Sequence, residues 1–241
     1  MHQFRLAIFA ILLTAMASAV QADVQEDFFK AVQSGKAKEL TQQMRPELLV
    51  EIDVPVLTAW MNAINDRLGP FKSIQQTGTT SEGGLTNPIK TSEATIQFER
   101  GTASSTLKTM GGKLIGFNVT SNELGDDWFK GPTETKLYEE LGQTFIKRFL
   151  GGQTDEAYAM CHPALQQAID AEAFAQMSQQ IRENAGALKS TTFTDSHMDI
   201  SDDGQYLLLN YNINCAEATG TCEIKIQFVG MKGHLLGYDF E

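Results

Sequence analysis

The chain has 241 residues, 42% of them hydrophobic and 20% charged, and its formal net charge is −11 at pH 7. These fractions are ordinary for folded domains and argue against a disordered or fibrous chain. An excess of acidic residues without a cluster of Lys and Arg repels phosphate backbones and anionic membrane surfaces, so nucleic acid is not expected as a partner.

Residues 1–22 have the pattern of a secretory signal peptide. Arg5 precedes an apolar run from Leu6 to Val20, and small residues follow, so cleavage is expected after Ala19 or Ala22. An uncleaved anchor is the alternative, but the run is shorter than the roughly 20 apolar residues of a membrane span. We expect an exported protein, periplasmic or extracellular, with no membrane association after signal cleavage.

The rest of the chain contains an internal repeat. When the chain is shifted by 117 positions over itself, about a dozen identities appear in order and without a gap between residues 28–73 and 145–190. A shift of 121 then aligns KLIGFNV at 113–119 with HLLGYDF at 234–240. Because the period exceeds 100 residues, it indicates two copies of a whole domain rather than a solenoid.

Each copy begins with a helical pattern. In the first copy, one helical segment ends at Gly35, the next is broken at Pro46, and a third runs from an Asp53 N-cap to Gly69. In the second copy, Asp170 is expected to cap the matching helix, which ends near Gly186. Its inward side chains are expected to be Phe174, Met177 and Ile181.

The second part of each copy alternates with period two, which predicts antiparallel strands. In the first copy the alternation turns at Gly101-Thr102, and in the second copy residues 205–215 and 222–230 form a pair. Helices followed by antiparallel strands indicate an α+β fold, with a curved sheet of about four strands in each copy.

These patterns divide the chain into four parts. A first α+β repeat at 23–119 follows the signal peptide, and a second repeat occupies 134–241. Residues 120–133 are polar and contain glycine and proline, so we interpret them as a linker whose Trp128-Phe129 pair docks on a domain.

Two cysteines fall on the predicted strand pair of the second copy. Alternation places Cys215 and Cys222 on the same face, and one register sets them opposite each other, with Ile213 opposite Ile224. A well-placed pair in an exported protein forms a bridge. We therefore expect a Cys215–Cys222 disulfide. Two free thiols are the alternative, and a metal site lacks a nearby histidine.

The third cysteine, Cys161, aligns with Met44 of the first copy. This favours a small buried hydrophobic residue over a nucleophile, although His162 is adjacent.

No phosphate-binding glycine loop and no H-E-x-x-H, C-x-x-C or G-x-S-x-G motif occurs in the sequence. We therefore expect no catalytic set, no metal and no cofactor. His197 lies between Asp195 and Asp199 on alternate strand positions, which would suit a metal, but a solvated sheet face is the preferred interpretation. The acidic pairs Asp126-Asp127 and Asp202-Asp203 are interpreted as solvated turns.

Each copy resembles the domain-of-unknown-function 3887 family. The stretches that carry the resemblance are DFFKAVQSGKAKELTQQMRPELLVEI, LGPFKSI and GKLIGFNV in the first copy, and TFIKRFLGGQTDEAYAMCHPALQQAI, AGALKST and GHLLGYDF in the second. The resemblance implies the cystatin-like, nuclear-transport-factor-like fold, in which helices pack into a cone of antiparallel sheet. Relatives of that fold include isomerases, dehydratases, ligand carriers and dimerisation modules, and the family offers no catalytic motif to carry over.

Two functions remain open from the sequence. The first is an exported, non-catalytic protein whose two domains bind a small ligand or a protein partner, of unknown identity and oligomeric state. The alternative is a small-molecule enzyme, of the isomerase or dehydratase kind, that uses a cavity in the second repeat. The candidate ligand-binding residues are Tyr158, His162, Tyr206 and Tyr211. The enzyme alternative requires that at least two of them converge on one cavity.

Overall fold

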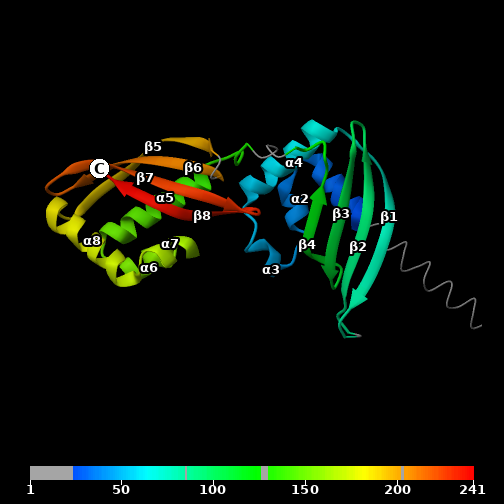
Figure 1. The fold of residues 1–241 in the computed structure, drawn as a ribbon, viewed down its shortest axis with the longest axis horizontal. Coiled ribbons are helices and arrows are strands. Elements are labelled where there is room, and N and C mark those ends of the chain that lie inside the picture. Colours follow the sequence, from blue (N-terminus) through cyan, green and yellow to red (C-terminus); the bar gives the residue numbers. More distant parts are fainter. Residues whose placement is uncertain (1–23, 85, 126–129, 202–203) are drawn as a thin grey trace, which may run out of the picture. The chain divides into compact units, whose positions relative to one another are not determined.

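The computed structural model describes residues 24–84, 86–125, 130–201 and 204–241. The expected signal peptide, the Trp128-Phe129 pair and the acidic pairs Asp126-Asp127 and Asp202-Asp203 lie outside these residues. The chain divides into two compact units, residues 1–129 and 130–241, coloured from blue to green and from green to red in Figure 1. Within the described residues, no helix has the length and apolar character to cross a membrane.

The first unit consists of helices followed by an antiparallel sheet with strand order β1-β2-β3-β4. Residues 24–34 form its first helix. The later elements are α2 (Ala37–Thr41), α3 (Pro46–Leu49), α4 (Val54–Leu68), β1 (Phe71–Glu82), β2 (Ile89–Phe98), β3 (Thr102–Met110) and β4 (Lys113–Thr120).

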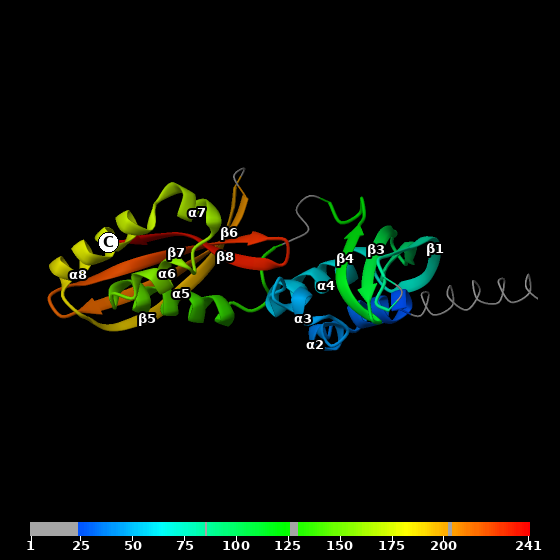
Figure 2. The same ribbon diagram turned by 90° about the horizontal axis from the view of Figure 1, so that it is seen from below.

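The second unit repeats this order, with a sheet of strand order β5-β6-β7-β8. Its elements are α5 (Lys136–Leu150), α6 (Thr154–Tyr158), α7 (Pro163–Ala168), α8 (Ala171–Ala185), β5 (Leu188–Ser201), β6 (Gly204–Cys215), β7 (Thr219–Val229) and β8 (Lys232–Phe240). In each unit the helices cover one face of the sheet (Figures 1 and 2). The predicted α+β class is thus confirmed, with two similar halves.

The two halves share their irregularities as well as their elements. In β1 and in β5 the strand pairing shifts at Lys72 and at Lys189, and again at Thr77 and at Thr194, each pair 117 positions apart. The bulges of the closing strands β4 and β8 lie 121 positions apart. A β-bulge is a specific local feature, so its recurrence at matching positions supports a residue-by-residue equivalence of the two units.

A short parallel bridge ties the helical part of each unit to its last strand. The bridge joins Met44 to Leu114 in the first unit and Cys161 to Leu235 in the second. These are the residues that the internal alignment pairs, so the shifts of 117 and 121 also hold at this contact.

Local sequence signals set the helix ends. Gly69 and Gly186 follow α4 and α8 with φ of 75° and 77°, a region that other residues adopt only with strain. The side chain of Asp170 accepts a hydrogen bond of 2.8 Å from the backbone amide of Ala173 and so caps α8.

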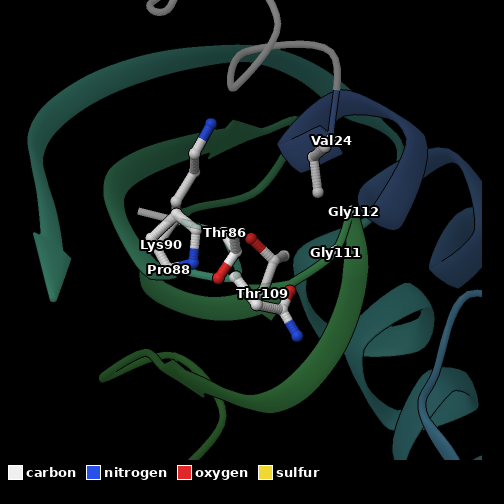
Figure 3. Close-up of a pocket in the computed structure, with 8 residues that line it drawn as sticks. Val24, Thr86, Pro88, Lys90, Thr109, Gly111 and Gly112 are labelled. Carbon is white, nitrogen blue, oxygen red and sulfur yellow. The ribbon is translucent and has the colours of Figure 1, made fainter. Parts of the chain in front are cut away.

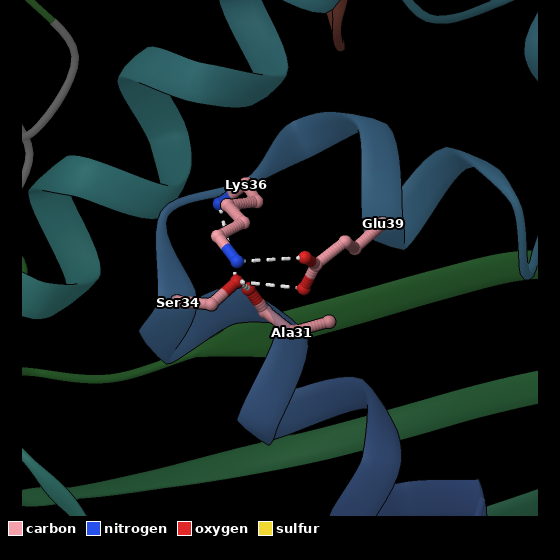
Figure 4. A network of polar contacts seen from close by, with 4 residues as sticks. All are labelled: Ala31, Ser34, Lys36 and Glu39. Carbon is pink, nitrogen blue, oxygen red and sulfur yellow. Dashed lines mark hydrogen bonds and ion pairs between the residues drawn. The ribbon is translucent and has the colours of Figure 1, made fainter.

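A polar cluster joins residues 24–34 to α2 in the first unit (Figure 4). The hydroxyl of Ser34 donates to the carbonyl oxygen of Ala31 at 2.7 Å, and the ammonium of Lys36 lies 2.9 Å from Glu39. Because this ion pair is exposed, it contributes little stability, and we interpret the cluster as a local cap.

Aromatic rings fill equivalent places in the two cores. The rings of Phe28 and Phe117 lie 5.3 Å apart in the first unit, and those of Phe145 and Tyr238 lie 5.1 Å apart in the second. All four residues occupy aligned positions, which places each core between the first long helix and the last strand.

The expected inward face of α8 was wrong at one position. Phe174 is fully buried and Ile181 is half-buried, but Met177 is 39% exposed. Ser178 is buried instead, and its hydroxyl donates to the carbonyl oxygen of Phe149. This hydrogen bond satisfies a hydroxyl that could not otherwise be buried at low cost.

The expected Cys215–Cys222 disulfide is also wrong, since all three cysteines are free and buried. The amide of Cys215 donates to the carbonyl oxygen of Ala218 and closes a short turn, so Cys222 lies opposite Tyr211. Four positions along a strand span about 13 Å, whereas bridged Cα atoms lie within about 7 Å. A shift of four residues leaves every side chain on its predicted face, which is why alternation did not reveal the error.

Candidate functional site

The hydroxyl of Tyr158 is used within the helical layer of the second unit. It lies 2.8 Å from the carbonyl oxygen of Gln166 and 2.9 Å from that of Ile169. The ring packs on Phe174, with their centroids 5.3 Å apart. Tyr158 therefore fastens α6 to α7.

His162 caps α7. Its Nδ1 accepts a hydrogen bond of 3.1 Å from the amide of Ala164, and its own backbone amide donates to the carbonyl oxygen of Leu235 at 2.7 Å. Its ring lies 5.3 Å from that of His234. His162 thus links the start of α7 to β8.

Tyr211 and Tyr206 lie on opposite faces of β6, because they are five positions apart on a strand without a bulge of its own. Tyr211 points toward the helices and is fully buried, and its hydroxyl donates to the carbonyl oxygen of Glu139 at 2.9 Å. Burial raises the pKa of this hydroxyl, with the carboxylate of Glu139 adding to the effect. The ammonium of Lys225 lies 3.8 Å from the centre of the Tyr206 ring.

The structure therefore brings Tyr158 and His162 to neighbouring helices and places Tyr206 and Tyr211 on two sides of a strand. Three of these four side chains are hydrogen-bonded to the protein backbone, and the fourth stacks against a lysine.

Two further titratable candidates, Cys161 and Asp195, are buried or hydrogen-bonded within the protein. Cys161 is buried, and this burial raises the pKa of its thiol to about 12, which disfavours the nucleophilic thiolate. Asp195, from the predicted acidic stripe around His197, accepts a hydrogen bond from Asn210 at 2.9 Å. No group of three or more possible metal ligands occurs among the described residues.

A pocket of about 280 Å³ opens in the second unit where the β6–β7 hairpin turns. We call it the hairpin-end pocket. Its inner wall is apolar, with Leu150, Ile213 and Phe240, and Cys215 adds its buried thiol. The remaining lining residues are Ile181, Asn184, Ala185, Ala218, Thr219, Gly220, Thr221 and Glu241.

Rigid elements hold these walls in place. Phe240 stacks on Phe149 of α5 with ring centroids 5.4 Å apart. The backbones of Thr221 and Glu241 exchange hydrogen bonds of 2.9 and 3.0 Å. Gly220 sits close to this pair, since a Cβ atom there would lie 2.1 Å from the carbonyl oxygen of Glu241. The pocket is therefore a built feature of the sheet end.

The first unit fills the equivalent region with larger side chains. Phe98 occupies the position of Cys215, because Phe71 pairs with Phe98 as Leu188 pairs with Cys215. Phe98 is buried, and the centroid of its ring lies 5.9 Å from that of Phe29 and 6.4 Å from that of Phe71. The second unit has Ile146, Leu188 and Cys215 at these three places.

A second exchange also places a smaller side chain in the second unit. Leu68, fully buried at the end of α4, corresponds to Ala185 in the pocket lining. Smaller side chains thus leave room at the hairpin end of the second unit.

Another pocket, of about 260 Å³, lies in the first unit beside the turns that join β1 to β2 and β3 to β4 (Figure 3). Its lining includes Asn87, Lys90, Thr109 and Gly111. Val24, the first described residue, borders it. We assign this pocket no role.

Of the residues that line the hairpin-end pocket, the sequence indicates Cys215 only as a disulfide partner and Ile181 only as an inward side chain, and it indicates none as a ligand-binding residue. The internal alignment contains part of the signal, because it sets Leu68 opposite Ala185, an exchange of a large side chain for a small one. The match of Phe98 with Cys215 lies outside the aligned ranges and follows from the strand pairing.

In comparisons with protein-family models, curated proteins and solved structures, nothing matches this chain. The resemblance to the domain-of-unknown-function 3887 family therefore stays a prediction.

Proposed function

We propose that this chain is an exported, non-catalytic binding protein whose second unit holds a small, largely apolar molecule in the hairpin-end pocket. The observation that carries the proposal is the replacement of Phe98 and Leu68 by Cys215 and Ala185, which leaves room for a pocket at the hairpin end of the second unit. Export rests on the signal-peptide pattern of residues 1–22.

The lining suggests the chemistry of the ligand. Leu150, Ile213 and Phe240 offer apolar surface, whose burial stabilises a complex by roughly 25 cal/mol per Å². Asn184 and Thr219 at the rim are exposed and offer hydrogen-bonding groups to one polar end of a ligand. A small molecule with an apolar body and one uncharged polar group fits this arrangement.

A binding role is favoured over an isomerase or dehydratase by where the candidate acids and bases lie. Tyr158, His162, Tyr206 and Tyr211 are not among the residues that line the hairpin-end pocket. A general acid or base needs to be within hydrogen-bond reach of the reacting group.

The test is methyl NMR of the chain without its signal peptide, titrated with indole as the probe. Ile181 and Ile213 line the pocket, and Ile64 and Ile96 occupy the aligned positions of the first unit, so each reporter has an internal control. We expect saturable shifts of the first two δ1-methyl signals and none of the other two.

Two variants import the residues of the first unit into the pocket. Cys215→Phe and Ala185→Leu each fill part of the space and are expected to remove the shifts at Ile181 and Ile213. Ala185→Leu lies near the rim and serves as the independent check if Cys215→Phe does not fold. Equal shifts in both units, or shifts that persist in a folded Ala185→Leu protein, would contradict the proposal.

A further inference from the structure

An open apolar groove of about 650 Å³ lies on the first unit. Its floor is formed by residues of α3 and its flanks, namely Met44, Pro46, Leu49, Ile52 and Val54, and its remaining walls by Lys38, Thr41, Gln42 and Lys113. We call it the α2–α3 groove.

Several apolar side chains in and beside the groove are exposed to solvent. Leu49 is 38% exposed and Val54 is 49% exposed, and the neighbouring Val50 is 60% exposed. Clustered exposed apolar side chains mark binding sites more often than isolated ones do.

One larger residue spans the equivalent place in the second unit. Tyr158 stands at the position of Thr41, and its hydroxyl reaches the carbonyl oxygens of Gln166 and Ile169. Those two residues correspond to Leu49 and Ile52 of the groove floor. Thr41 lacks the ring that spans this distance, so the groove stays open in the first unit.

The charges of the groove have one sign. Lys38 and Lys113 line it, no Asp or Glu does, and neither lysine forms an ion pair within the part of the chain that the structure describes. The nearby Arg45 is paired with Glu47 at 3.1 Å. Two unpaired ammonium groups beside an apolar floor are unusual in a chain whose net charge is −11, and they complement an anionic head group.

We propose that the α2–α3 groove binds a single-chain carboxylate amphiphile, the chemical class of free long-chain fatty acids. The hydrocarbon chain lies over Leu49, Ile52 and Val54, and the carboxylate lies at the rim with Lys38 and Lys113. The site belongs to the first unit and is independent of the hairpin-end pocket.

The test is calorimetric titration of the chain without its signal peptide with dodecanoate, below the concentration at which it forms micelles. Dodecyltrimethylammonium has the same chain and the opposite charge, and dodecanol has the same chain and no charge. We expect dodecanoate to bind most tightly and the cationic amphiphile at least tenfold more weakly. The Ile52 δ1-methyl signal should shift, while that of its counterpart Ile169 should not.

Variants separate the apolar from the ionic part of the site. Thr41→Tyr imports the residue of the second unit and should weaken binding of both dodecanoate and dodecanol at least tenfold. Leu49→Gln, which imports Gln166, gives a second floor variant if Thr41→Tyr does not fold. The double variant Lys38→Gln/Lys113→Gln should weaken dodecanoate binding about tenfold and leave dodecanol unchanged. Lys108→Gln, an exposed lysine outside the groove, is the matched control.

Several outcomes would overturn the proposal. Equal affinity for the anionic and cationic amphiphiles, or unchanged dodecanoate binding in folded Thr41→Tyr and Leu49→Gln proteins, would place any binding elsewhere. A dimer in sedimentation that Thr41→Tyr converts to a monomer, without dodecanoate binding to the parent chain, would assign the groove to a second copy of the protein. Shifts confined to Ile213 would assign dodecanoate to the hairpin-end pocket instead.

Discussion

The hydroxyl of Tyr211 on β6 donates a hydrogen bond to the backbone carbonyl oxygen of Glu139 on α5 at 2.9 Å, from a fully buried side chain. The ring passes Gly142, where an added Cβ atom would lie 2.4 Å from the hydroxyl oxygen. The first unit reverses these sizes, with Gln25 on its first helix and Ala94 on β2 at the two aligned positions.

Gln25 fills its core in a different way. Its Nε2 donates to the carbonyl oxygen and the hydroxyl of Ser92 at 3.1 Å each, and its Oε1 accepts from Ser105 at 3.3 Å. The same region of the core is thus filled by a large helix side chain in the first unit and by a large strand side chain in the second.

We predict that Gly142→Ala destabilises the second unit by about 1–3 kcal/mol, although alanine is the better helix former. The new methyl group would collide with Tyr211, which has no free space to move into. Urea unfolding measures the change. A more stable Gly142→Ala protein would show that the contact yields easily.

The exchanged pair supplies the coupling test. Tyr211→Ala alone is expected to cost about 3–5 kcal/mol, because it leaves a cavity. Gly142→Gln combined with Tyr211→Ala recreates the arrangement of Gln25 and Ala94 and should cost at least 1 kcal/mol less than the sum of the single changes. Strict additivity would mean that the two positions do not share one space.

Tyr158→Phe should destabilise the second unit by about 1 kcal/mol, since it removes the hydroxyl that fastens α6 to α7 and retains the ring. Thermal unfolding compared with the parent chain measures this loss. Unchanged stability would indicate that water replaces the hydroxyl at both carbonyl oxygens.

All three thiols should be present in the native protein, and those of Cys161 and Cys222 should be protected. The three cysteines are free and buried, and burial raises the pKa of each thiol, but Cys215 lines the hairpin-end pocket. An iodoacetamide pulse at pH 8 should leave Cys161 and Cys222 unlabelled in the folded chain and modify all three cysteines in denaturant. An intact mass lower by two hydrogens in the exported protein would instead demonstrate a disulfide.

Stability should fall in alkaline solution. Burial raises the pKa of Cys161 from 9.0 to about 12, so above pH 9 the unfolded chain loses a proton that the folded chain retains. The free energy of unfolding then decreases with rising pH, by about 1.4 kcal/mol per pH unit for each such group, until the folded group also ionises.

Cys161→Met, which imports Met44 and cannot ionise, should have a shallower decline between pH 9 and 11. Tyr238, whose pKa burial raises to about 12, contributes to the slope that remains. Parallel pH profiles for the parent and the variant would refute a role for the Cys161 thiol.

Local signals in the sequence were sufficient for the class of fold. Gly69 and Gly186 ended the long helices where expected, and alternation in β6 and β7 placed Cys215 and Cys222 on the helix-facing side. The register was not predictable in the same way, because alternation has a period of two and any even shift preserves it. The hydrogen bond that closes the turn decides among these registers.

The pocket was harder to predict because it depends on small side chains that leave space, and not on residues with reactive groups. Tyr158 and Tyr211 are candidates in the sequence because of their reactive groups, yet in the structure their hydroxyls contact backbone carbonyl oxygens. The hairpin-end pocket arises from small residues, Cys215 and Ala185, whose significance appears only when the three-dimensional positions of both units are compared.

Native mass spectrometry of the protein isolated from the cells that produce it tests the proposed function most directly. We expect a small molecule bound to the parent chain, absent from Ala185→Leu and retained by the matched first-unit variant Leu68→Ile. A chain that carries no small molecule, or one whose every bound molecule is also found on Ala185→Leu, would contradict the assignment of a ligand to the hairpin-end pocket.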